Sequence, residues 1–246
     1  MNKHTIRSGL VIVAALGVWS LVGVPASRAA PIELLTNGGF ESGDLSGWSI
    51  FERGGSALFV DNTTTSPASG FATAGPSSGN YYAVADGALG ATALVQNFTT
   101  DAGSNATLRF NMFVASGTPF VADPSGLDHT TGGSFEANQH ARVDLLAAGS
   151  DPFGASVLAS YYLDIDGPLD PANPYKSYSF DLSAVAGLGG TYQLRFAQVN
   201  NQDFLIQGID NVSVTVGGAP IPTPITLSLF AIGLLALSTA QRRKRS

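Results

Sequence analysis

Short runs of alternating apolar and polar residues restrict the fold of this chain more than any other feature. In the run 191–197, large apolar residues alternate with polar ones. The apolar residues are Tyr192, Leu194 and Phe196, and the polar residues between them are Gln193 and Arg195. A period of two predicts a β-strand with one face in the core and the other in water. Gln193 and Arg195 are therefore predicted to face solvent.

Nine short runs of this kind lie between turns rich in Gly, Asn and Pro, and no long stretch has apolar residues at helical spacing. The runs are 57–60, 81–84, 93–98, 107–114, 141–146, 156–161, 178–182, 192–197 and a last one that ends at Val216. Strands of this number and length predict an all-β fold, an antiparallel jelly-roll β-sandwich that forms one domain over 31–216. The polar stretch Gly117–His140 is predicted to be a long loop.

The N-terminus has the pattern of a secretion signal. Lys3 and Arg7 precede an apolar run, Leu10–Val24, and small residues follow at Ser27 and Ala29. This order predicts a signal peptide over 1–29 that signal peptidase removes. The alternative is an uncleaved membrane helix, for which the run is short, since a helix needs about 20 apolar residues to span a membrane.

The C-terminus predicts a membrane anchor. Residues 225–240 are apolar and uncharged, and a basic tail over 242–245 follows them, made of Arg242, Arg243, Lys244 and Arg245. Basic residues beside a hydrophobic helix stay in the cytoplasm, which would leave the preceding domain outside. The alternative, a buried core helix, would not need to stop at the chain end against a cluster of cations.

The motif Pro222-Thr223-Pro224, an apolar helix and an Arg-rich end resemble the PEP-CTERM sorting signal, which exosortases read in Gram-negative bacteria. The family usually has Glu where Thr223 stands here. The resemblance implies that 217–246 is a sorting segment. It also implies that the protein is anchored in the inner membrane only until this segment is cleaved. The resemblance further implies that the protein is then transferred to the cell surface or the extracellular matrix.

The charge of the central region limits its partners. Between the two terminal segments lie all 18 acidic residues and only 5 basic ones, a surplus of 13 negative charges. Such a surface repels phosphate backbones, which excludes nucleic acid and leaves neutral sugars and divalent cations as ligands. The chain has no Cys, which excludes disulfides and thiolate metal sites.

Four motifs in order are similar to carbohydrate-binding modules of the galactose-binding-like jelly-roll superfamily. They lie at 35–41 (Leu-Thr-Asn-Gly-Gly-Phe-Glu), 47–48 (Gly-Trp), 96–98 (Gln-Asn-Phe) and 208–214 (Gly-Ile-Asp-Asn-Val-Ser-Val). The resemblance implies a structural calcium held by the carboxylates of Glu41 and Asp210 and by backbone oxygens near Asn37 and Gly39. Calcium takes about 6 to 8 oxygen ligands. The alternative is that both carboxylates bond to backbone amides or solvent.

A sugar site needs a flat aromatic face beside amide, carboxylate or guanidinium groups that meet the hydroxyls. The candidates for an extracellular polysaccharide are Tyr81, Tyr82, Tyr161, Tyr162, Asn201 and Asp203. In each Tyr-Tyr pair the two rings point to opposite sides of a strand, so one ring of each pair is predicted to be exposed.

Little in the sequence points to catalysis. His129 and His140 are the histidines outside the signal peptide, and neither a Gly-x-Ser-x-Gly nor a His-Glu-x-x-His motif occurs. The sequence predicts an exported, non-catalytic protein of the cell surface or exopolysaccharide matrix that binds glycans or has a structural role. The alternatives are an extracellular polysaccharide hydrolase and a purely structural adhesin or biofilm component.

Overall fold

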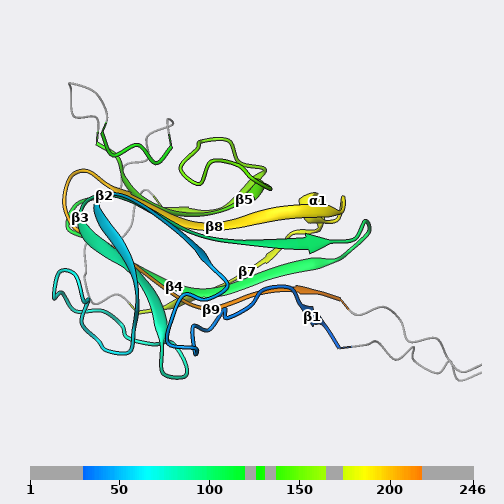
Figure 1. The fold of residues 1–246 in the computed structure, drawn as a ribbon, viewed down its shortest axis with the longest axis horizontal. Coiled ribbons are helices and arrows are strands. Elements are labelled where there is room, and N and C mark those ends of the chain that lie inside the picture. The colour runs from blue at the N-terminus through cyan, green and yellow to red at the C-terminus, as the bar shows by residue number, and fades with distance from the viewer. Residues whose placement is uncertain (1–29, 120–125, 131–136, 165–173, 218–246) are drawn as a thin grey trace, which may run out of the picture. The chain divides into compact units, whose positions relative to one another are not determined.

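The computed structural model describes residues 30–119, 126–130, 137–164 and 174–217. Within these residues the chain forms nine strands and one short helix, α1 (Ser183–Ala186) (Figure 1). The strands are β1 (Ile32–Glu33), β2 (Ser49–Asp61), β3 (Tyr82–Thr100), β4 (Ala106–Ser116), β5 (Gln139–Ala147), β6 (Ala159–Asp164), β7 (Lys176–Asp181), β8 (Gly190–Asn200) and β9 (Leu205–Val216). The predicted all-β fold is confirmed.

Both predicted terminal segments lie outside the described residues, apart from Gly217. This holds for the signal peptide over 1–29 and for the sorting residues Pro222, Thr223, Pro224, Arg242, Arg243, Lys244 and Arg245. In the part of the chain that the structure describes, no helix is both long and apolar enough to cross a membrane.

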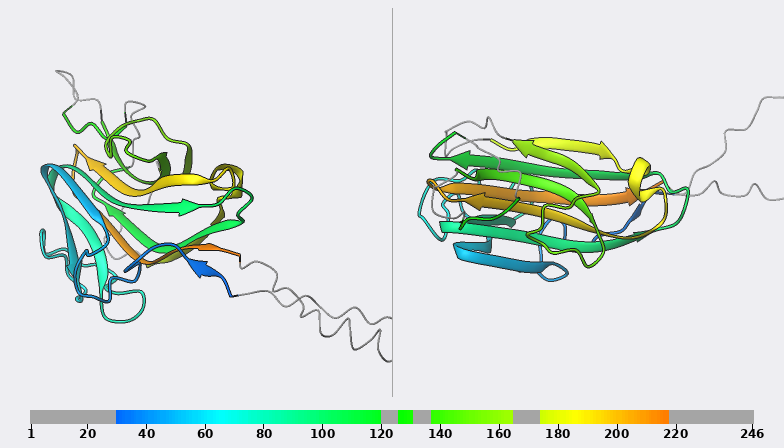
Figure 2. Two further views of the ribbon diagram at one scale, coloured as in Figure 1. Left: turned by 45° about the vertical axis from the view of Figure 1, so that its right-hand side comes forward. Right: turned by 90° about the horizontal axis from the view of Figure 1, so that it is seen from above.

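The strands pair antiparallel throughout and form two layers (Figures 1 and 2). Their hydrogen-bonded order is β6-β5-β8-β3-β9-β4-β7, with β2 beside β3 and β1 beside β9. Strand β3 belongs to both layers, because Gly90–Thr100 pairs with β8 and Ala83–Ala85 pairs with β9. The first layer is thus β6, β5, β8 and the second half of β3, and the second layer is β7, β4, β9 and the first half of β3.

Glycines let β2 and β3 bend together from one layer into the other. Strand β2 has a bulge between Gly54 and Ser56, and the backbone φ angles are 66° at Gly54 and 130° at Gly87. Residues other than glycine rarely adopt such angles. The predicted strands 81–84 and 93–98 are therefore one long strand, and the alternation pattern missed the bend because each half keeps its own period of two.

The core between the layers is rich in aromatic rings. The ring centroids of Phe110 and Phe196 lie 5.1 Å apart, and those of Trp48 and Phe196 lie 6.2 Å apart, both edge to face. Tyr192, Leu194 and Phe196 are buried here, as the alternation predicted. Edge-to-face contacts add to the stability that burial of apolar area provides.

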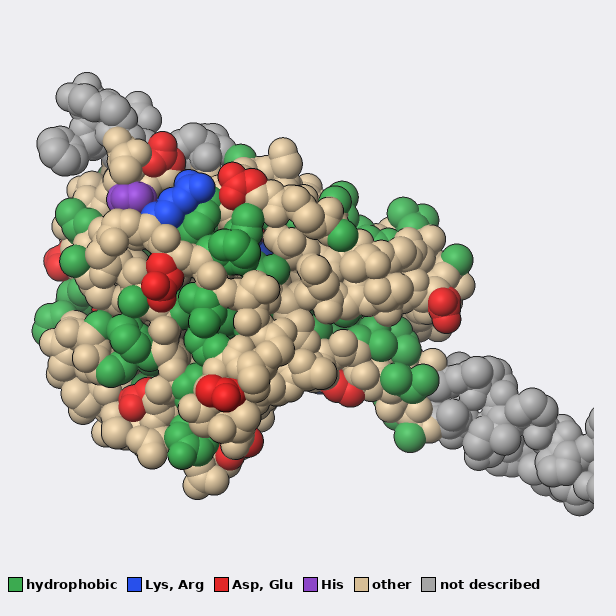
Figure 3. Space-filling model, viewed as in Figure 1, with side chains coloured by type: hydrophobic (Ala, Val, Ile, Leu, Met, Phe, Trp, Pro, Cys, Tyr) green, Lys and Arg blue, Asp and Glu red, His purple; other side chains and the backbone are tan. Residues whose placement is uncertain are grey.

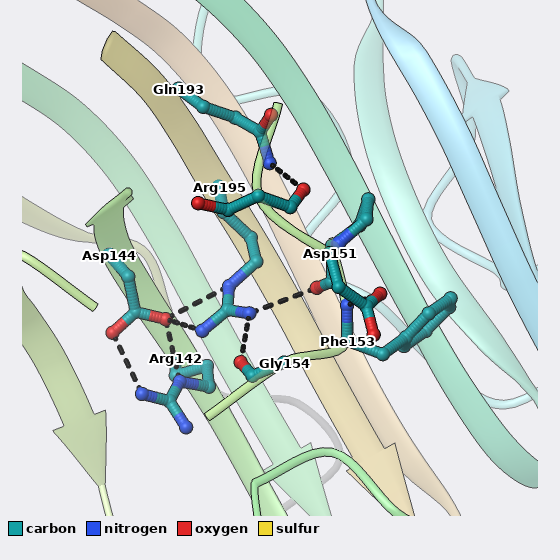
Figure 4. A network of polar contacts seen from close by, with 9 residues as sticks. Arg142, Asp144, Asp151, Phe153, Gly154, Gln193 and Arg195 are labelled. Carbon is teal, nitrogen blue, oxygen red and sulfur yellow. Dashed lines mark hydrogen bonds and ion pairs between the residues drawn. The ribbon is translucent and has the colours of Figure 1, made fainter. Parts of the chain in front are cut away.

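The predicted solvent-facing side of β8 is wrong. Gln193 is 5% exposed and Arg195 is 0% exposed, because the connection between β5 and β6 covers them (Figure 4). The Arg195 guanidinium donates to the backbone oxygens of Pro152 and Gly154, both at 2.9 Å. A single strand pattern cannot show that a distant loop folds over its polar face.

Asp144 on β5 balances the buried guanidinium of Arg195. Its Oδ2 lies 2.5 Å from Nη2 of Arg195 and 2.6 Å from Nε of Arg142. Burial lowers the pKa of Arg195, and the charge of Asp144 opposes that shift. The covering loop also contacts β2, because the guanidinium of Arg53 on β2 lies 4.0 Å from the centroid of the Phe153 ring in the loop.

Candidate functional site

The motifs that carry the resemblance hold the N-terminal segment onto the sandwich. The Gln96 side chain accepts from the Thr36 amide at 2.7 Å and donates to the Thr36 oxygen at 3.0 Å, as a neighbouring strand would. The Trp48 indole donates to the Asn37 oxygen at 3.1 Å. The Gly38 oxygen accepts from the Val212 amide at 2.8 Å. These motifs therefore have a structural role in this chain.

Glu41 closes the loop that precedes β3. Its Oε1 accepts from the backbone amides of Asn80 at 2.9 Å and Tyr81 at 3.1 Å. These hydrogen bonds favour the ionised form and hold the pKa of Glu41 below its ordinary value of 4.5.

Asp210 binds the same loop from β9. It is fully buried, and its Oδ2 accepts from the amides of Ser77 at 2.8 Å and Ser78 at 3.0 Å. Its Oδ1 accepts from the amide of Asn211 at 2.6 Å. Burial raises the pKa of Asp210, the three amides oppose that shift, and the negative charge of Glu41 adds to it.

Three of the four residues predicted to hold calcium, Asn37, Glu41 and Asp210, accept hydrogen bonds from N–H groups. Glu41 and Asp210 direct their side-chain oxygens at backbone N–H groups, and the Asn37 backbone oxygen accepts from the Trp48 indole at 3.1 Å. Near Gly39 lie the side chains of Glu41 and Asn211. Calcium needs a cage of oxygens directed at one point, and N–H donors cannot supply it. This arrangement does not fit calcium, and it matches the alternative in which both carboxylates bond to amides.

Tyr82 cannot offer a ring face to a sugar, which corrects its place among the predicted binding residues. It is fully buried, with its hydroxyl 2.7 Å from Thr73 Oγ1 and 3.2 Å from Asp61 Oδ2. Burial raises its pKa to about 12. Its neighbour Tyr81 is half-buried and packs on the inter-layer core.

Tyr161 and Tyr162 join the two layers at their open edge. The ring of Tyr161 lies 5.3 Å from that of Phe180, and the ring of Tyr162 lies 5.5 Å from that of Tyr178, which places β6 against β7. Both tyrosines are half-buried, and burial raises the pKa of Tyr161. The structure does not bring either pair of tyrosines together with Asn201 and Asp203.

Asp203 lines a pocket of about 440 Å³ at the end of the sandwich where β2 and β3 bend. We call it the Phe71 pocket. Its lining comes from the segment between β2 and β3, from the bend within β3, and from the end of β8 with the segment that follows it. The lining residues are Ala68, Ser69, Phe71, Gly87, Ala88, Leu89, Asn200, Gln202, Asp203 and Phe204. The rings of Phe71 and Phe204 lie 4.7 Å apart, and Phe71 is 43% exposed.

A buried carboxylate holds the turn that presents Phe71. Ser66 accepts from the Gly70 amide at 3.0 Å and donates to the Phe71 oxygen at 2.8 Å, which closes a tight turn. The hydroxyls of Ser66 and Ser69 both donate to Oδ2 of Asp86, which is fully buried. A turn held this way limits the conformations of Phe71 before any ligand arrives.

Buried amides hold the opposite wall of the Phe71 pocket. Gln139 Nε2 donates to the oxygens of Asp203 at 3.2 Å and Phe204 at 3.0 Å, and Asn200 Nδ2 donates to Asp203 at 3.4 Å. Gln139 and Asn200 are fully buried. Asn201 is also buried, and its Oδ1 accepts from the Asn138 amide at 2.8 Å, so it supports the loop and does not line the pocket.

The described lining of the Phe71 pocket contains one acid, Asp203, and no basic residue. On the face shown in Figure 3, acidic side chains are spread over the molecule, whereas basic ones gather in one place. An aromatic pair beside amide and carboxylate groups can stack on a pyranose ring and bind its hydroxyls.

A second pocket, of about 470 Å³, is lined by residues of β2, β3 and β8 and of the segment before β2. Its lining includes Phe51, which is 38% exposed, together with Asn97 and Gln193. Gln193 donates to the Ser150 oxygen at 3.3 Å, so part of its amide is already used. This second pocket is a natural comparison for the Phe71 pocket, because each has one exposed phenylalanine.

Asp203, a predicted binding residue, lines the Phe71 pocket, whereas the sequence did not point to Phe71, Asp86 or Gln139. The polar run 200–203 followed by Phe204 was a usable signal. Phe71 had none, because it lies 132 positions before Asp203 in a stretch of small residues. Only the bend of β2 and β3 brings these segments together.

No protein-family model matches the chain, and no curated protein matches it. Solved structures with a similar fold include TmCBM61 in complex with β-1,4-galactotriose, with 14% identity, a TM-score of 0.43, and coverage of 74% of this chain and 97% of that one. The K3 cleaved adhesin domain of Lys-gingipain from Porphyromonas gingivalis has 17% identity, a TM-score of 0.46, and coverage of 76% and 99%. A cyclase from Fischerella sp. TAU has 19% identity, a TM-score of 0.47, and coverage of 79% and 100%. The descriptions of these three proteins differ from one another, and each applies to that protein alone.

Proposed function

We propose that this chain is an exported, non-catalytic protein of the cell surface or extracellular matrix that binds glycans in the Phe71 pocket. The observation that carries the proposal is the contact of Phe71 with Phe204 at 4.7 Å beside the exposed side chains of Gln202 and Asp203. Polar groups for sugar hydroxyls therefore adjoin an exposed aromatic surface for the C–H face of a ring.

Preorganisation supports binding at this place. Asp86 holds the turn of Phe71, and Gln139 holds the loop of Asp203 and Phe204. Buried polar groups that are fully satisfied make the surrounding structure rigid. A rigid pocket loses less conformational entropy when a ligand binds, so a modest number of contacts suffices for affinity.

Binding without catalysis is the reading that the described lining favours. Glycoside hydrolysis generally uses two carboxyl groups on either side of the scissile bond. Among the described residues that line the Phe71 pocket, Asp203 is the one carboxylate. The alternative, a polysaccharide hydrolase, would release sugar from a polymer and would lose that activity when a single carboxylate became an amide.

The Phe71 pocket and the proposed attachment point lie at opposite ends of β9. Phe204 lies just before β9, and Val216 ends it beside Ile32 of β1. At about 3.3 Å per residue, a strand of this length separates the two ends by about 35 Å. In the proposed export route, signal peptidase removes 1–29 and an exosortase acts at Pro222-Thr223-Pro224. The Phe71 pocket would then lie at the end of the domain away from the attachment point.

The test is glycan binding by the purified domain, residues 30–217, with Phe71→Ala and Phe204→Ala as variants. We expect the domain to bind oligosaccharides on an array and by calorimetry without releasing product. Each variant should weaken binding about twofold to twelvefold, because one aromatic contact is worth about 0.5 to 1.5 kcal/mol.

Phe51→Ala is the matched control, because it removes a phenylalanine of similar exposure from the second pocket. It should leave glycan affinity unchanged. If Phe51→Ala alone abolished binding, the site would be the second pocket. A chain that bound no glycan would be better described as a structural adhesin or biofilm component.

A further inference from the structure

We propose that the Phe71 pocket is selective for sugars that carry a protonated amine, so that its ligand is an amino sugar with free amino groups. This inference rests on the proposed function and narrows its ligand class. It follows from the position and bonding of Asp203, from the aromatic pair beside it, and from the charge of the described lining.

Asp203 is available to a cationic ligand. It is exposed, and both salt bridges among the described residues involve Asp144, so Asp203 has no ion-pair partner in that part of the chain. Its Oδ1 accepts from the Phe204 amide at 2.7 Å, which fixes the direction of the carboxylate. Oδ2 lies beside Gly117 and accepts no hydrogen bond from the described residues, so it can accept one from a ligand.

The loop that bears Asp203 is fixed at several points. Gln139 donates to its backbone oxygen, and the Gly117 amide donates to the Phe204 oxygen at 3.0 Å. The carboxylate therefore does not need to be ordered when a ligand binds. Charge-assisted hydrogen bonds to an ordered carboxylate are stronger than those between neutral groups.

The aromatic pair favours the same ligand. The faces of Phe71 and Phe204 carry negative electrostatic potential, which attracts an ammonium group as well as ring C–H groups. An amino sugar presents both on one ring. A uronic acid would instead place its carboxylate beside Asp203 without a basic residue among the described lining to offset the repulsion.

The charge of the whole domain acts in the same direction. The basic residues of the central region are Arg53, Arg109, Arg142, Lys176 and Arg195. None of the five lines the Phe71 pocket, and Arg142 and Arg195 are already paired with Asp144. The surplus of acidic groups therefore raises the local concentration of cationic oligosaccharides and lowers that of anionic ones.

The experiment compares three tetrasaccharide probes by calorimetry on the domain over 30–217: glucosamine, N-acetylglucosamine and glucuronic acid oligomers. We expect the free-amine oligomer to bind about fivefold or more tightly than the acetylated one, which corresponds to about 1 kcal/mol, the upper range of an exposed ion pair. The uronic acid oligomer should bind most weakly. Ethanolamine, an amine without a ring, should not compete.

Asp203→Asn should remove the preference for the free amine and leave the affinity for the acetylated oligomer within about twofold, because one ionic contact is lost and the stacking remains. The matched control is Asp101→Asn, an exposed acid in the turn before β4, which changes the net charge equally. Asp203→Ser is a second variant that keeps an acceptor for the Phe204 amide, and melting curves verify that each variant is folded.

Equal affinity for the free-amine and acetylated oligomers would overturn the amino-sugar inference and leave glycan binding intact. If Asp101→Asn lost the preference for the free-amine oligomer as Asp203→Asn does, the preference would come from the overall charge of the domain. That result would also overturn the proposed role of Asp203. Binding of ethanolamine as tight as that of the oligomer would show a general ammonium site. If no oligosaccharide bound at all, glycan binding itself would be wrong.

Discussion

Arg195 of β8 and Asp144 of β5 lie opposite each other in the strand register and form an ion pair from which water is excluded. Their Nη2 and Oδ2 atoms are 2.5 Å apart, and both side chains are 0% exposed. The same guanidinium binds two backbone oxygens of the covering loop (Figure 4). The pair therefore joins two strands of the sheet to the covering loop.

Removal of Asp144 should be among the most destabilising single changes in the domain. Asp144→Ala leaves two buried guanidinium groups without their counter-ion, so we expect a loss of about 3 to 5 kcal/mol in the free energy of unfolding. Urea denaturation measures it. Arg109→Ala, which removes an exposed arginine from β4, should cost less than about 1 kcal/mol. Similar losses for the two variants would mean that the buried pair does not stabilise the fold.

Gly38→Ala should destabilise the domain far more than Gly39→Ala. A Cβ at Gly38 would lie 1.8 Å from the backbone oxygen of Val212, whereas at Gly39 the nearest atom would be 3.8 Å away. The clash at Gly38 is with backbone, so β9 must shift, at a cost of about 1 to 3 kcal/mol or more. Thermal melts of the two variants test the difference, and equal melting temperatures would contradict the close approach of this motif to β9.

Glu41→Gln should lower the melting temperature near neutral pH and have less effect in acid. The pKa of Glu41 is below 4.5 in the folded chain, so its stabilising contribution is present above about pH 4.5 and is lost as the pH falls through the lowered pKa. The pKa of Asp210 is raised, so its contribution to the pH dependence of stability has the opposite sign. The contribution of Glu41 is therefore obtained as the difference between the unmodified domain and Glu41→Gln at each pH. The difference in melting temperature between the unmodified domain and Glu41→Gln should be smaller at about pH 3 than at about pH 7. Asp101→Asn serves as the control, and a gap independent of pH would exclude the carboxylate of Glu41 as its cause.

Calcium should not change the stability of the domain. The carboxylates of Glu41 and Asp210 are directed at backbone amides, and N–H groups cannot be calcium ligands. A melt with excess EDTA should therefore match one with millimolar calcium. A higher melting temperature with calcium that Asp210→Asn removed would instead establish the metal site that the sequence motif predicted.

The sequence by itself determined the class of the fold, because a period of two is a local property of each strand. The runs that became β4, β5, β7, β8 and β9 were recognisable from their own residues. The alternation also assigned Phe196 to the core. It could not show that 81–84 and 93–98 are one strand, since the bend at Gly87 depends on pairing with β2 and β9.

Only the tertiary structure decided which residues form a site. The Phe71 pocket joins Phe71, Leu89 and Asp203, which no spacing in the sequence relates. The same holds for the burial of Arg195, which depends on a loop that begins more than forty residues earlier. Local patterns specify which face of a strand is apolar, but the folding of distant loops onto the sheet decides which polar groups meet water, one another or a ligand.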